Sequence, residues 1–179
     1  KATQDSLTGL TNHAYARKVI STRMKSNPDD TFVLMVLDMD HFKNANDEYG
    51  HLFGDEVLKH LAKTLRASVR DDDIVARVGG DEFLICMELD ADPKPLVDRI
   101  YSSISGQYGD FPISVSMGVE CINGGDMEYD EFFKRADRAL YSMKRNGRGG
   151  YVYGVDANFG KEEGSVISTI ESDEVNSRN

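Results

Sequence analysis

The sequence contains no tryptophan, four prolines and only two cysteines among its 179 residues. Both cysteines, Cys86 and Cys121, stand in apolar runs typical of buried strands, so we expect free thiols and a reducing, cytoplasmic environment. No run approaches the roughly 18 consecutive apolar residues of a membrane span, and no signal peptide is recognisable. Because the chain starts at Lys1 without an initiator methionine, we expect a domain taken from a longer protein, which could itself be anchored in a membrane.

Positive charge is scarce as well, with 21 lysines and arginines against 31 aspartates and glutamates and a net charge of −10. Proteins that bind a polyanion or an anionic membrane by general attraction are usually basic. We therefore expect no nucleic-acid partner and no membrane contact by this domain, whereas a small anionic ligand remains possible where basic side chains converge. The 40% of hydrophobic residues is typical of a globular chain with one full core.

What is present is an alternation of helical and strand-like periodicities. Helices are predicted at residues 12–25, 54–69, 95–104 and 129–145, and strands at residues 32–37, 74–78, 83–89, 111–121 and 151–153. The continuous apolar run at 32–37 is typical of a central strand that is covered on both faces. The two strands on either side of Gly79-Gly80 form a predicted hairpin.

The composition changes after Val155. Residues 156–179 carry six acidic and two basic side chains and few large apolar ones. We therefore divide the chain into a folded domain, residues 1–155, and an acidic tail or linker, residues 156–179, which we expect to be flexible. The alternative is a tail that docks on the domain through Val166 and Ile167.

Acidic residues gather where two predicted strands meet loops. The central strand continues into Asp38, Met39 and Asp40, and Asp81 and Glu82 follow the two glycines of the hairpin. Side chains alternate along a strand, so Asp38 and Asp40 are expected on one face, and a neighbouring hairpin would bring all four acids together. Packed carboxylates repel one another unless they hold a cation or share a proton, and oxygen ligands suit Mg²⁺. The alternative is a tight turn with solvated acids.

Five segments of the sequence carry a family resemblance. They are "DSLTGLTN" at residues 5–12, "DMDHFKNANDEYGHLFGDEVL" at 38–58, "RVGGDEF" at 77–83, "SVSMGV" at 114–119 and "ADRALYSMKRNGRG" at 136–149. In order and spacing, over residues 5–154, they resemble the GGDEF domain, the catalytic domain of diguanylate cyclases. The resemblance implies an α/β (α+β) fold in which helices wrap a central, mostly antiparallel sheet, as in nucleotidyl cyclases and the polymerase palm. It also implies a bacterial signalling enzyme that joins two GTP into cyclic di-GMP and releases two pyrophosphates.

The same resemblance implies a metal site. Asp38 and Asp81 would ligate Mg²⁺, or Mn²⁺ in its place, with help from the backbone carbonyl of Met39. Glu82 would be either a further metal ligand or the base that takes the proton of the 3′-hydroxyl group, and both roles stay open. Asp81 and Glu82 are accordingly the expected catalytic residues.

The resemblance also implies that Asn46 and Asp55 read the guanine base. An aspartate can accept hydrogen bonds from guanine N1–H and N2–H₂ together, which adenine cannot offer, so ATP should be rejected. The alternative is that Asp55 only caps a helix that follows Gly54.

A further set of residues would surround the phosphates. By resemblance these are Phe42, Lys43, Gly79, Gly80, Lys144 and Arg148. The two glycines would let the backbone approach the ligand without obstruction by a Cβ atom. Taken alone, Lys144 and Arg148 could instead be charges that complement the end of a helix dipole.

The segment "RDDD" places Arg70 and Asp73 at the family's product-inhibition site, an Arg-x-x-Asp that would bind cyclic di-GMP. Arginine can form two parallel hydrogen bonds with guanine or phosphate, and aspartate can read the edge of guanine. A second arginine often joins from the following helix, but the aligned position holds Tyr101, and Arg99 is only close in the sequence. The completeness of this site therefore stays open, and the alternative is a polar turn between helix and strand.

Catalysis on two GTP molecules implies a homodimer whose half-sites face each other. Three other functions stay open. The chain could be a catalytically weak relative that binds GTP or cyclic di-GMP as a regulatory module, a cyclase that also uses ATP, or a dimerisation module without chemistry. The intact acids argue against the first and third, and Asp55 argues against the second.

Overall fold

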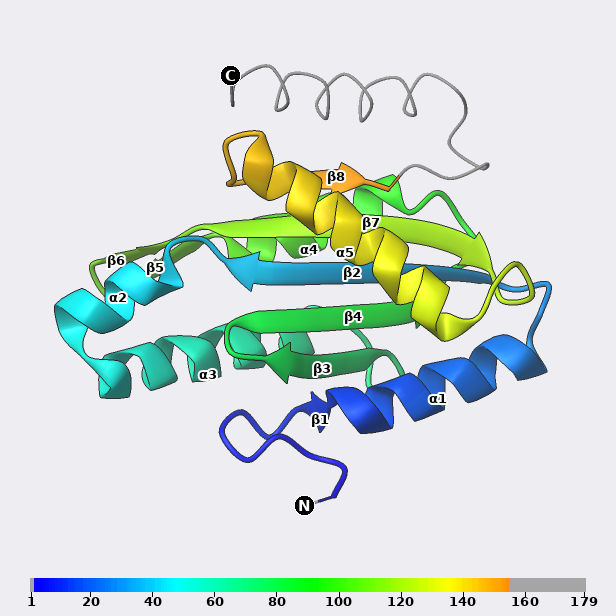
Figure 1. Ribbon diagram of the computed structural model, residues 1–179, viewed down its shortest axis with the longest axis horizontal. Helices are drawn as coiled ribbons and strands as arrows, with labels where there is room; N and C mark the ends of the chain where they lie inside the picture. Colours follow the sequence, from blue (N-terminus) through cyan, green and yellow to red (C-terminus); the bar gives the residue numbers. More distant parts are fainter. Residues whose placement is uncertain (1, 155–179) are drawn as a thin grey trace, which may run out of the picture.

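The computed structural model describes residues 2–154, and the predicted acidic tail, residues 156–179, lies outside the described residues. Figure 1 shows the described elements, which are β1 (Thr11–Asn12), α1 (His13–Ser26), β2 (Thr31–Met39), α2 (Phe42–Tyr49), α3 (His51–Ala67), β3 (Ile74–Gly79), β4 (Glu82–Glu88), α4 (Lys94–Ile104), β5 (Gly106–Tyr108), β6 (Phe111–Ile113), β7 (Val115–Asn123), α5 (Tyr129–Arg145) and β8 (Tyr151–Tyr153). Among them, no helix combines the length and the apolar content needed to cross a membrane.

A six-stranded sheet forms the middle layer, in the order β1-β3-β4-β2-β7-β8. The four inner strands pair antiparallel, and only the outermost strands β1 and β8 pair parallel with their neighbours. The prediction of a mostly antiparallel sheet is therefore confirmed. Strands β5 and β6 form a separate two-stranded hairpin.

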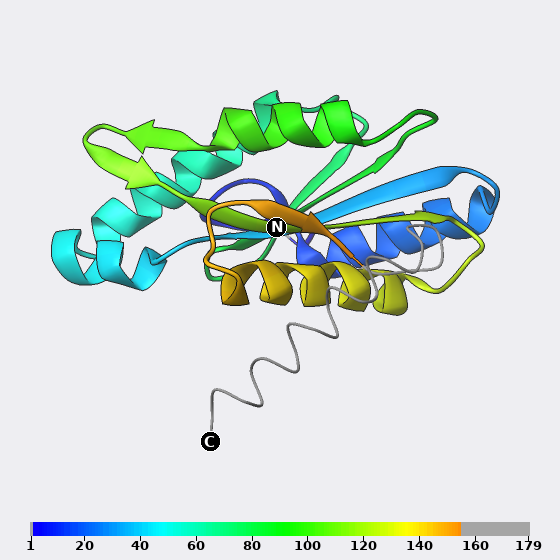
Figure 2. The same cartoon turned by 90° about the horizontal axis from the view of Figure 1, so that it is seen from above.

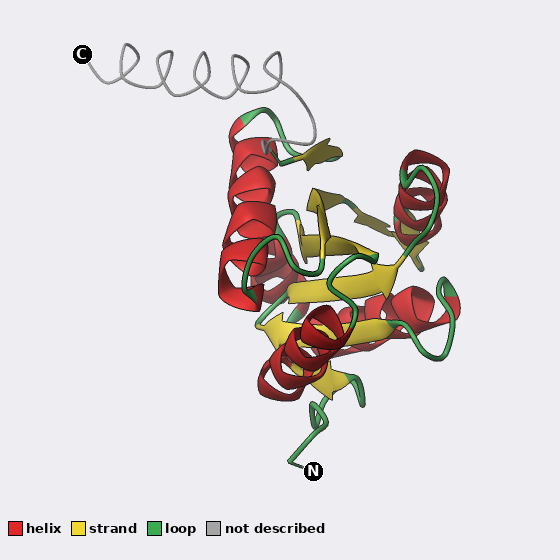
Figure 3. Ribbon diagram, turned by 90° about the vertical axis from the view of Figure 1, so that its right-hand side faces the viewer, coloured by secondary structure: helices red, strands yellow, loops and turns green. Residues whose placement is uncertain are grey.

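The central strand β2 is apolar on both faces because helices cover both. Val33, Met35 and Leu37 belong to the core beneath α3 and α4, whereas the residues between them belong to the core beneath α1 and α5. Figure 2 shows these two helical layers on opposite sides of the sheet, and Figure 3 shows the same arrangement from another side. The chain thus forms three layers, and the even-numbered positions of β2, including Asp38, face α1 and α5.

Helix α5 lies close on β7 because residue 118 has no side chain. A Cβ atom at Gly118 would overlap the backbone of α5 at Ala136 and Leu140. This packing brings the C-terminal end of α5 to the end of the sheet where β2 stops. The helix therefore carries its basic residues to the place where the acids of the sheet lie.

Three short elements were not predicted from the sequence. Helix α2 buries only Ala45, so its sequence shows little apolar periodicity, and β1 and β5 have two and three residues. The prediction that a helix begins at Gly54 was wrong by one turn, because α3 begins at His51. Gly50 separates α2 from α3 with a φ of 89°, a value that favours glycine.

Candidate active site

The register of two neighbouring strands brings the predicted acids together. Asp38 on β2 is the direct partner of Glu82 on β4, so the two side chains share one face of the sheet. Asp81 stands immediately before Glu82, in the turn that joins β3 to β4. In Figure 1, β2 ends and this hairpin turns at the left-hand end of the sheet, and the three acids belong to these segments.

Asp38 is buried, with 6% of the residue exposed. Its Oδ2 atom forms an ion pair with the ammonium group of Lys144, which reaches it from the last turn of α5. Its Oδ1 atom is buried and has no hydrogen-bond partner. Because an unpaired buried carboxylate oxygen is costly, this atom is poised to accept a cation or a donor from a ligand.

The three acids are harder to ionise than isolated carboxyl groups. Burial raises the pKa of Asp38, and the charges of Asp81 and Asp40 raise it further, although Lys144 opposes them. Burial also raises the pKa of Asp81. For Glu82, burial together with the charges of Asp137 and Asp38 raises the pKa to about 7. The metal-free site therefore holds more buried negative charge than its basic residues balance.

Asp137 of α5 is a member of this site that the sequence did not indicate. Its charge is one of the causes that raise the pKa of Glu82, so its carboxylate lies close to that side chain. Asp137 lies inside the quoted segment "ADRALYSMKRNGRG", but helical spacing alone does not show which side of α5 meets the hairpin.

Oxygen ligands, burial and excess negative charge fit a divalent cation. Within residues 2–154, no three His, Cys, Asp or Glu side chains are already arranged to hold one metal ion. Lys144 supplies positive charge at Asp38 instead, and the partnerless Oδ1 atom is free for a ligand. A cation could approach Asp38 through this Oδ1 atom while Lys144 keeps its contact with Oδ2, and Asp81 and Glu82 would supply the other carboxylates.

Asp40 does not join the other acids as a free carboxylate. It is buried and is occupied by the hydroxyl groups of Ser114 and Ser116 and by the backbone N–H of Gly149. The expectation that Asp40 belongs to a convergent acidic site is corrected in this respect.

Asn46 and Asp55 lie on the facing helices α2 and α3. The Oδ1 atom of Asn46 is buried without a hydrogen-bond partner and lies so close to Gly54 that a Cβ atom there would overlap it. Asp55 is half-buried within α3. The interpretation of Asp55 as a helix cap was wrong, because the cap of α3 is Gly50.

The basic residues approach the acids from two sides. Lys43 is exposed in the first turn of α2, whose first N–H groups have no acceptor within the helix. Lys144 and Arg148 come from the end of α5 and the loop that follows it. The ring of Phe42 packs against the core, and the predicted role of Phe42 and of the Phe42-Lys43 backbone beside the phosphates stays a prediction.

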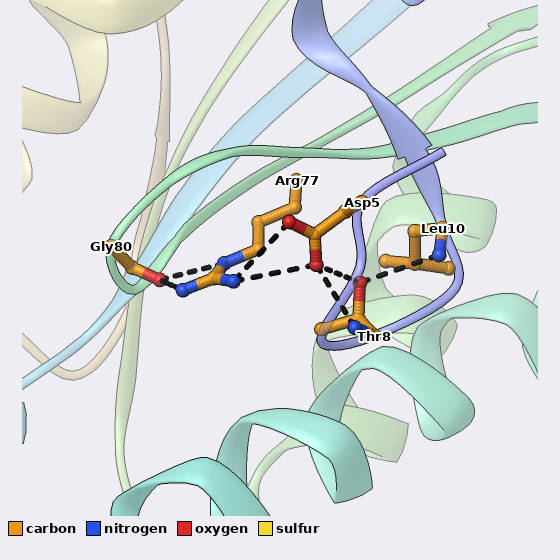
Figure 4. A network of polar contacts seen from close by, with 5 residues as sticks. All are labelled: Asp5, Thr8, Leu10, Arg77 and Gly80. Atoms are coloured by element: carbon orange, nitrogen blue, oxygen red, sulfur yellow. Dashed lines mark hydrogen bonds and ion pairs between the residues drawn. The ribbon is translucent and has the colours of Figure 1, made fainter. Parts of the chain in front are cut away.

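The turn between β3 and β4 has open space around its two glycines, and hydrogen bonds from Arg77 hold it in place. Cβ atoms at Gly79 and Gly80 would meet nothing within 4 Å. Figure 4 shows how Arg77 donates twice to the carbonyl of Gly80, at 2.9 and 2.7 Å, and also binds both oxygens of Asp5. Asp5 in turn accepts hydrogen bonds from the backbone and hydroxyl of Thr8. Both residues stand in segments that carry the family resemblance, but nothing in the sequence indicated this contact between them.

A groove of about 400 Å³ lies at the opposite end of β3 and is lined by Ala67, Ser68, Val69, Arg70, Asp73, Met87, Glu88, Leu89, Leu96 and Arg99. Asp73 accepts the backbone N–H of Arg70 at 2.8 Å, so these two residues form a turn as well as one wall of the groove. Arg99 donates to the carbonyl of Ser68 and faces the same groove. The hydroxyl group of Tyr101, the position aligned with a second arginine, donates to the carbonyl of Val115, and the completeness of the predicted inhibitory site stays open.

The raised pKa of Glu82 predicts a pH-dependent stability of the metal-free protein. Folding favours the protonated side chain, so its contribution to stability is complete below about 4.5 and is lost as the pH rises through about 7. Glu82→Gln should therefore raise the melting temperature near pH 8 in the presence of a chelator, and the gain should nearly vanish toward pH 5. Thermal melts across this range measure the effect.

Glu56→Gln is the matched control, because Glu56 is exposed on α3 and should show no gain of this kind. Equal melting temperatures for the wild type and Glu82→Gln at every pH would contradict the assigned environment of Glu82.

Comparison with known proteins identifies the family of this chain. The family model described as "Diguanylate cyclase, GGDEF domain" matches residues 2–150. The chain is 38% identical over 158 residues to the diguanylate cyclase DgcP of Pseudomonas aeruginosa, which covers 83% of this chain and 23% of DgcP. It is 35% identical over 152 residues to the diguanylate cyclase DgcS of Shewanella oneidensis, covering 82% of this chain and 51% of DgcS. The chain therefore spans about half or less of the length of these relatives.

Solved structures agree in fold. The GGDEF domain of DgcB from Caulobacter crescentus, in complex with c-di-GMP, superposes with a TM-score of 0.76 at 30% identity, covering 86% of this chain and 96% of that one. The GGDEF domain of PA1120 from Pseudomonas aeruginosa superposes with a TM-score of 0.78 at 29% identity, covering 85% and 94%. With the family model spanning most of the chain, these similarities establish that this protein belongs to the GGDEF diguanylate cyclase family.

Proposed function

We propose that this domain joins two GTP molecules into cyclic di-GMP and releases two pyrophosphates. The observation that carries the proposal is the pairing of buried Asp38 with half-buried Glu82 on adjacent strands, next to Asp81 and with Lys144 in contact with Asp38. Transfer to an α-phosphate needs negative charge to be neutralised and a hydroxyl group to be activated. This site offers groups for both tasks.

Mg²⁺, or Mn²⁺, would be held by Asp38, Asp81 and the carbonyl of Met39, with Glu82 as a possible further ligand. The metal would supply charge neutralisation on the phosphates and polarise them for attack. Lys144 would leave Asp38 and bind a phosphate once a cation neutralises the charge of Asp38. Lys43, Arg148 and the first N–H groups of α2 bind the remaining phosphate oxygens.

Glu82 is the candidate base for the 3′-hydroxyl group. With a pKa of about 7 in the metal-free site, it can take up a proton near neutral pH, as a general base must. The exposed carboxylate of Asp137 lies close enough for its charge to raise the pKa of Glu82, which favours uptake of the proton. The alternative role of Glu82 as a metal ligand stays part of this proposal, because the carboxylate has two oxygens.

Asn46 and Asp55 select guanine. The buried, partnerless Oδ1 atom of Asn46 and the half-buried carboxylate of Asp55 are acceptors, and guanine offers donors at N1 and N2. Adenine would leave these acceptors unpaired, which a buried site penalises strongly.

The reaction requires two copies of the domain. One domain carries acids and basic groups for a single triphosphate, whereas each GTP supplies both a 3′-hydroxyl group and an α-phosphate. Two half-sites related by a two-fold axis meet this requirement. The net charge of −10 on each copy opposes their association. The activity of the isolated domain therefore depends on how often two copies meet.

Cyclic di-GMP binds back to the groove lined by Arg70, Asp73 and Arg99 and inhibits the enzyme. The groove joins two guanidinium groups and a carboxylate around about 400 Å³, a donor and acceptor set suited to guanine and phosphate. The DgcB domain that this chain resembles was solved in complex with c-di-GMP.

Purified protein incubated with GTP and Mg²⁺ at high concentration should release pyrophosphate and form cyclic di-GMP. Asp81→Asn should lower both by roughly a hundredfold or more, because an amide cannot offset the charge of the metal. Product chromatography and a pyrophosphate assay measure this. Asp29→Asn, in an exposed loop between α1 and β2, is the control that should keep full activity. Intact GTP at concentrations that force dimers would refute the proposed reaction.

Specific activity should fall when the protein is diluted, because the encounter of two domains limits the rate. A parallel leucine zipper fused before Lys1 should restore activity at low concentration, since tethering raises the effective concentration to the order of millimolar. The same fusion with prolines in the zipper core is the control. A constant rate per enzyme over about a hundredfold dilution, with only monomer in sedimentation, would argue against a two-domain mechanism.

Arg70→Ala and Arg99→Ala should each raise the cyclic di-GMP concentration for half-inhibition by about tenfold, the usual loss for one charge-assisted contact. The uninhibited rate should stay unchanged, because the groove lies at the far end of β3. Tyr101→Phe is the control, since its hydroxyl group bonds to Val115 and not to the groove. Unaltered inhibition in both arginine variants would remove the groove from the mechanism.

A further inference from the structure

Asp40 lies just after β2 and contacts both the segment that leads into β7 and the loop that follows α5. Only 1% of its side chain is exposed, yet it does not contribute to the metal site of Asp38 and Asp81. It accepts hydrogen bonds from the hydroxyl groups of Ser114 and Ser116, both at 2.6 Å. Its own backbone N–H donates to the carbonyl of Ser114 at 2.8 Å. The end of β2 is thus fixed to the start of β7.

The same carboxylate also holds the loop that follows α5. Its Oδ2 atom accepts the backbone N–H of Gly149 at 3.0 Å, and its Oδ1 atom lies 3.8 Å from a guanidinium nitrogen of Arg148. The Gly149 N–H is shared with the hydroxyl of Ser116 at 3.2 Å. A single buried charge therefore joins β2, β7 and this loop.

The loop needs such support because its backbone is strained. Arg148 has a φ of 65°, in the left-handed region that costs a side-chain-bearing residue free energy. Gly147 and Gly149, on either side, have φ values of 104° and 64°. Three successive residues with positive φ hold their conformation only where neighbours fix it, and the Asp40 contacts are at the end of this run.

We propose that Asp40 is a positioning residue, which holds Arg148 and the backbone of Gly149 in the conformation that receives the phosphates of GTP. This inference rests on the proposed function, because it assigns Arg148 to the triphosphate. Asp40 acts through the loop and contributes no metal ligand.

Asp40→Asn separates charge from shape. The amide oxygen can still accept the bonds of Ser114 and Gly149, and the amide nitrogen can donate to Ser116, but the charge that faces Arg148 is lost. Affinity for a GTP analogue with a methylene α–β bridge, measured by calorimetry with Mg²⁺, should fall about tenfold. Affinity of the nucleotide-free protein for Mn²⁺ should stay unchanged. Asp126→Asn is the control, an aspartate that accepts a backbone N–H at the other end of β7.

A double-mutant cycle tests whether Asp40 acts through the loop. In an Arg148→Met background, Asp40→Asn should lower analogue affinity by much less than tenfold, because the partner of the charge is already gone. A merely structural role would lower the melting temperature equally in both backgrounds and give additive losses of affinity. If Asp40→Asn does not fold, Ser116→Ala is the second variant. It keeps the charge of Asp40 but removes the hydroxyl group that bonds to Asp40 and Gly149, and it should also lower affinity for the analogue.

The outcomes separate this inference from the proposed function. Wild-type protein that binds no GTP analogue and makes no product would refute the proposed function itself. Wild-type binding that Asp40→Asn leaves unchanged would refute the positioning role alone. Loss of Mn²⁺ affinity in Asp40→Asn would identify Asp40 as a metal ligand and overturn the proposal, as would additive effects in the cycle.

Discussion

The antiparallel pairing of Asp38 with Glu82 is the constraint on which the rest of the site depends. The apolar residues of β2 and β4 fix this register, because a slip by one residue would turn every buried side chain toward the opposite helical layer. The pairing places the buried carboxylate of Asp38 beside the half-buried one of Glu82, and the charge of Asp38 helps to raise the pKa of Glu82. The ion pair from Lys144 of α5 offsets part of this negative charge.

Two arginine–aspartate contacts fix the loops on either side of these acids. Arg77 ties the hairpin turn to Asp5 in the N-terminal segment, and Arg148 lies against the buried Asp40 behind the other loop. Both pairs are shielded to some degree from water, so they are worth more than exposed ion pairs at the surface. The pair of Asp38 and Glu82 thus lies between two loops that belong to no strand or helix. An arginine–aspartate contact holds the backbone of each loop in place.

Much of this arrangement could be predicted from the sequence, and the failures have physical causes. The long apolar and amphipathic segments gave the central strand, the hairpin and α5, because burial enforces their periodicity. Helix α2 was missed because it buries only Ala45. The site residues Asp38, Asp81, Glu82 and Lys144 were found through the motifs, but the partners Asp137 and Arg99 were not. Which side of a helix meets a distant strand depends on crossing angles, and local spacing does not encode those angles.

The two proposed ligand sites lie at opposite ends of one strand. Strand β3 runs from the groove of Arg70 and Asp73 to the turn at Gly79, six residues that span about 20 Å at roughly 3.3 Å each. A cyclic dinucleotide in the groove would therefore not displace GTP from the acids of its own domain by direct contact. Because the sheet between the two regions is too well packed to deform continuously, the proposed feedback would have to act on how two domains approach each other. Each of the two proposed sites gathers its own basic residues, which is how a chain with a net charge of −10 would hold anions in both.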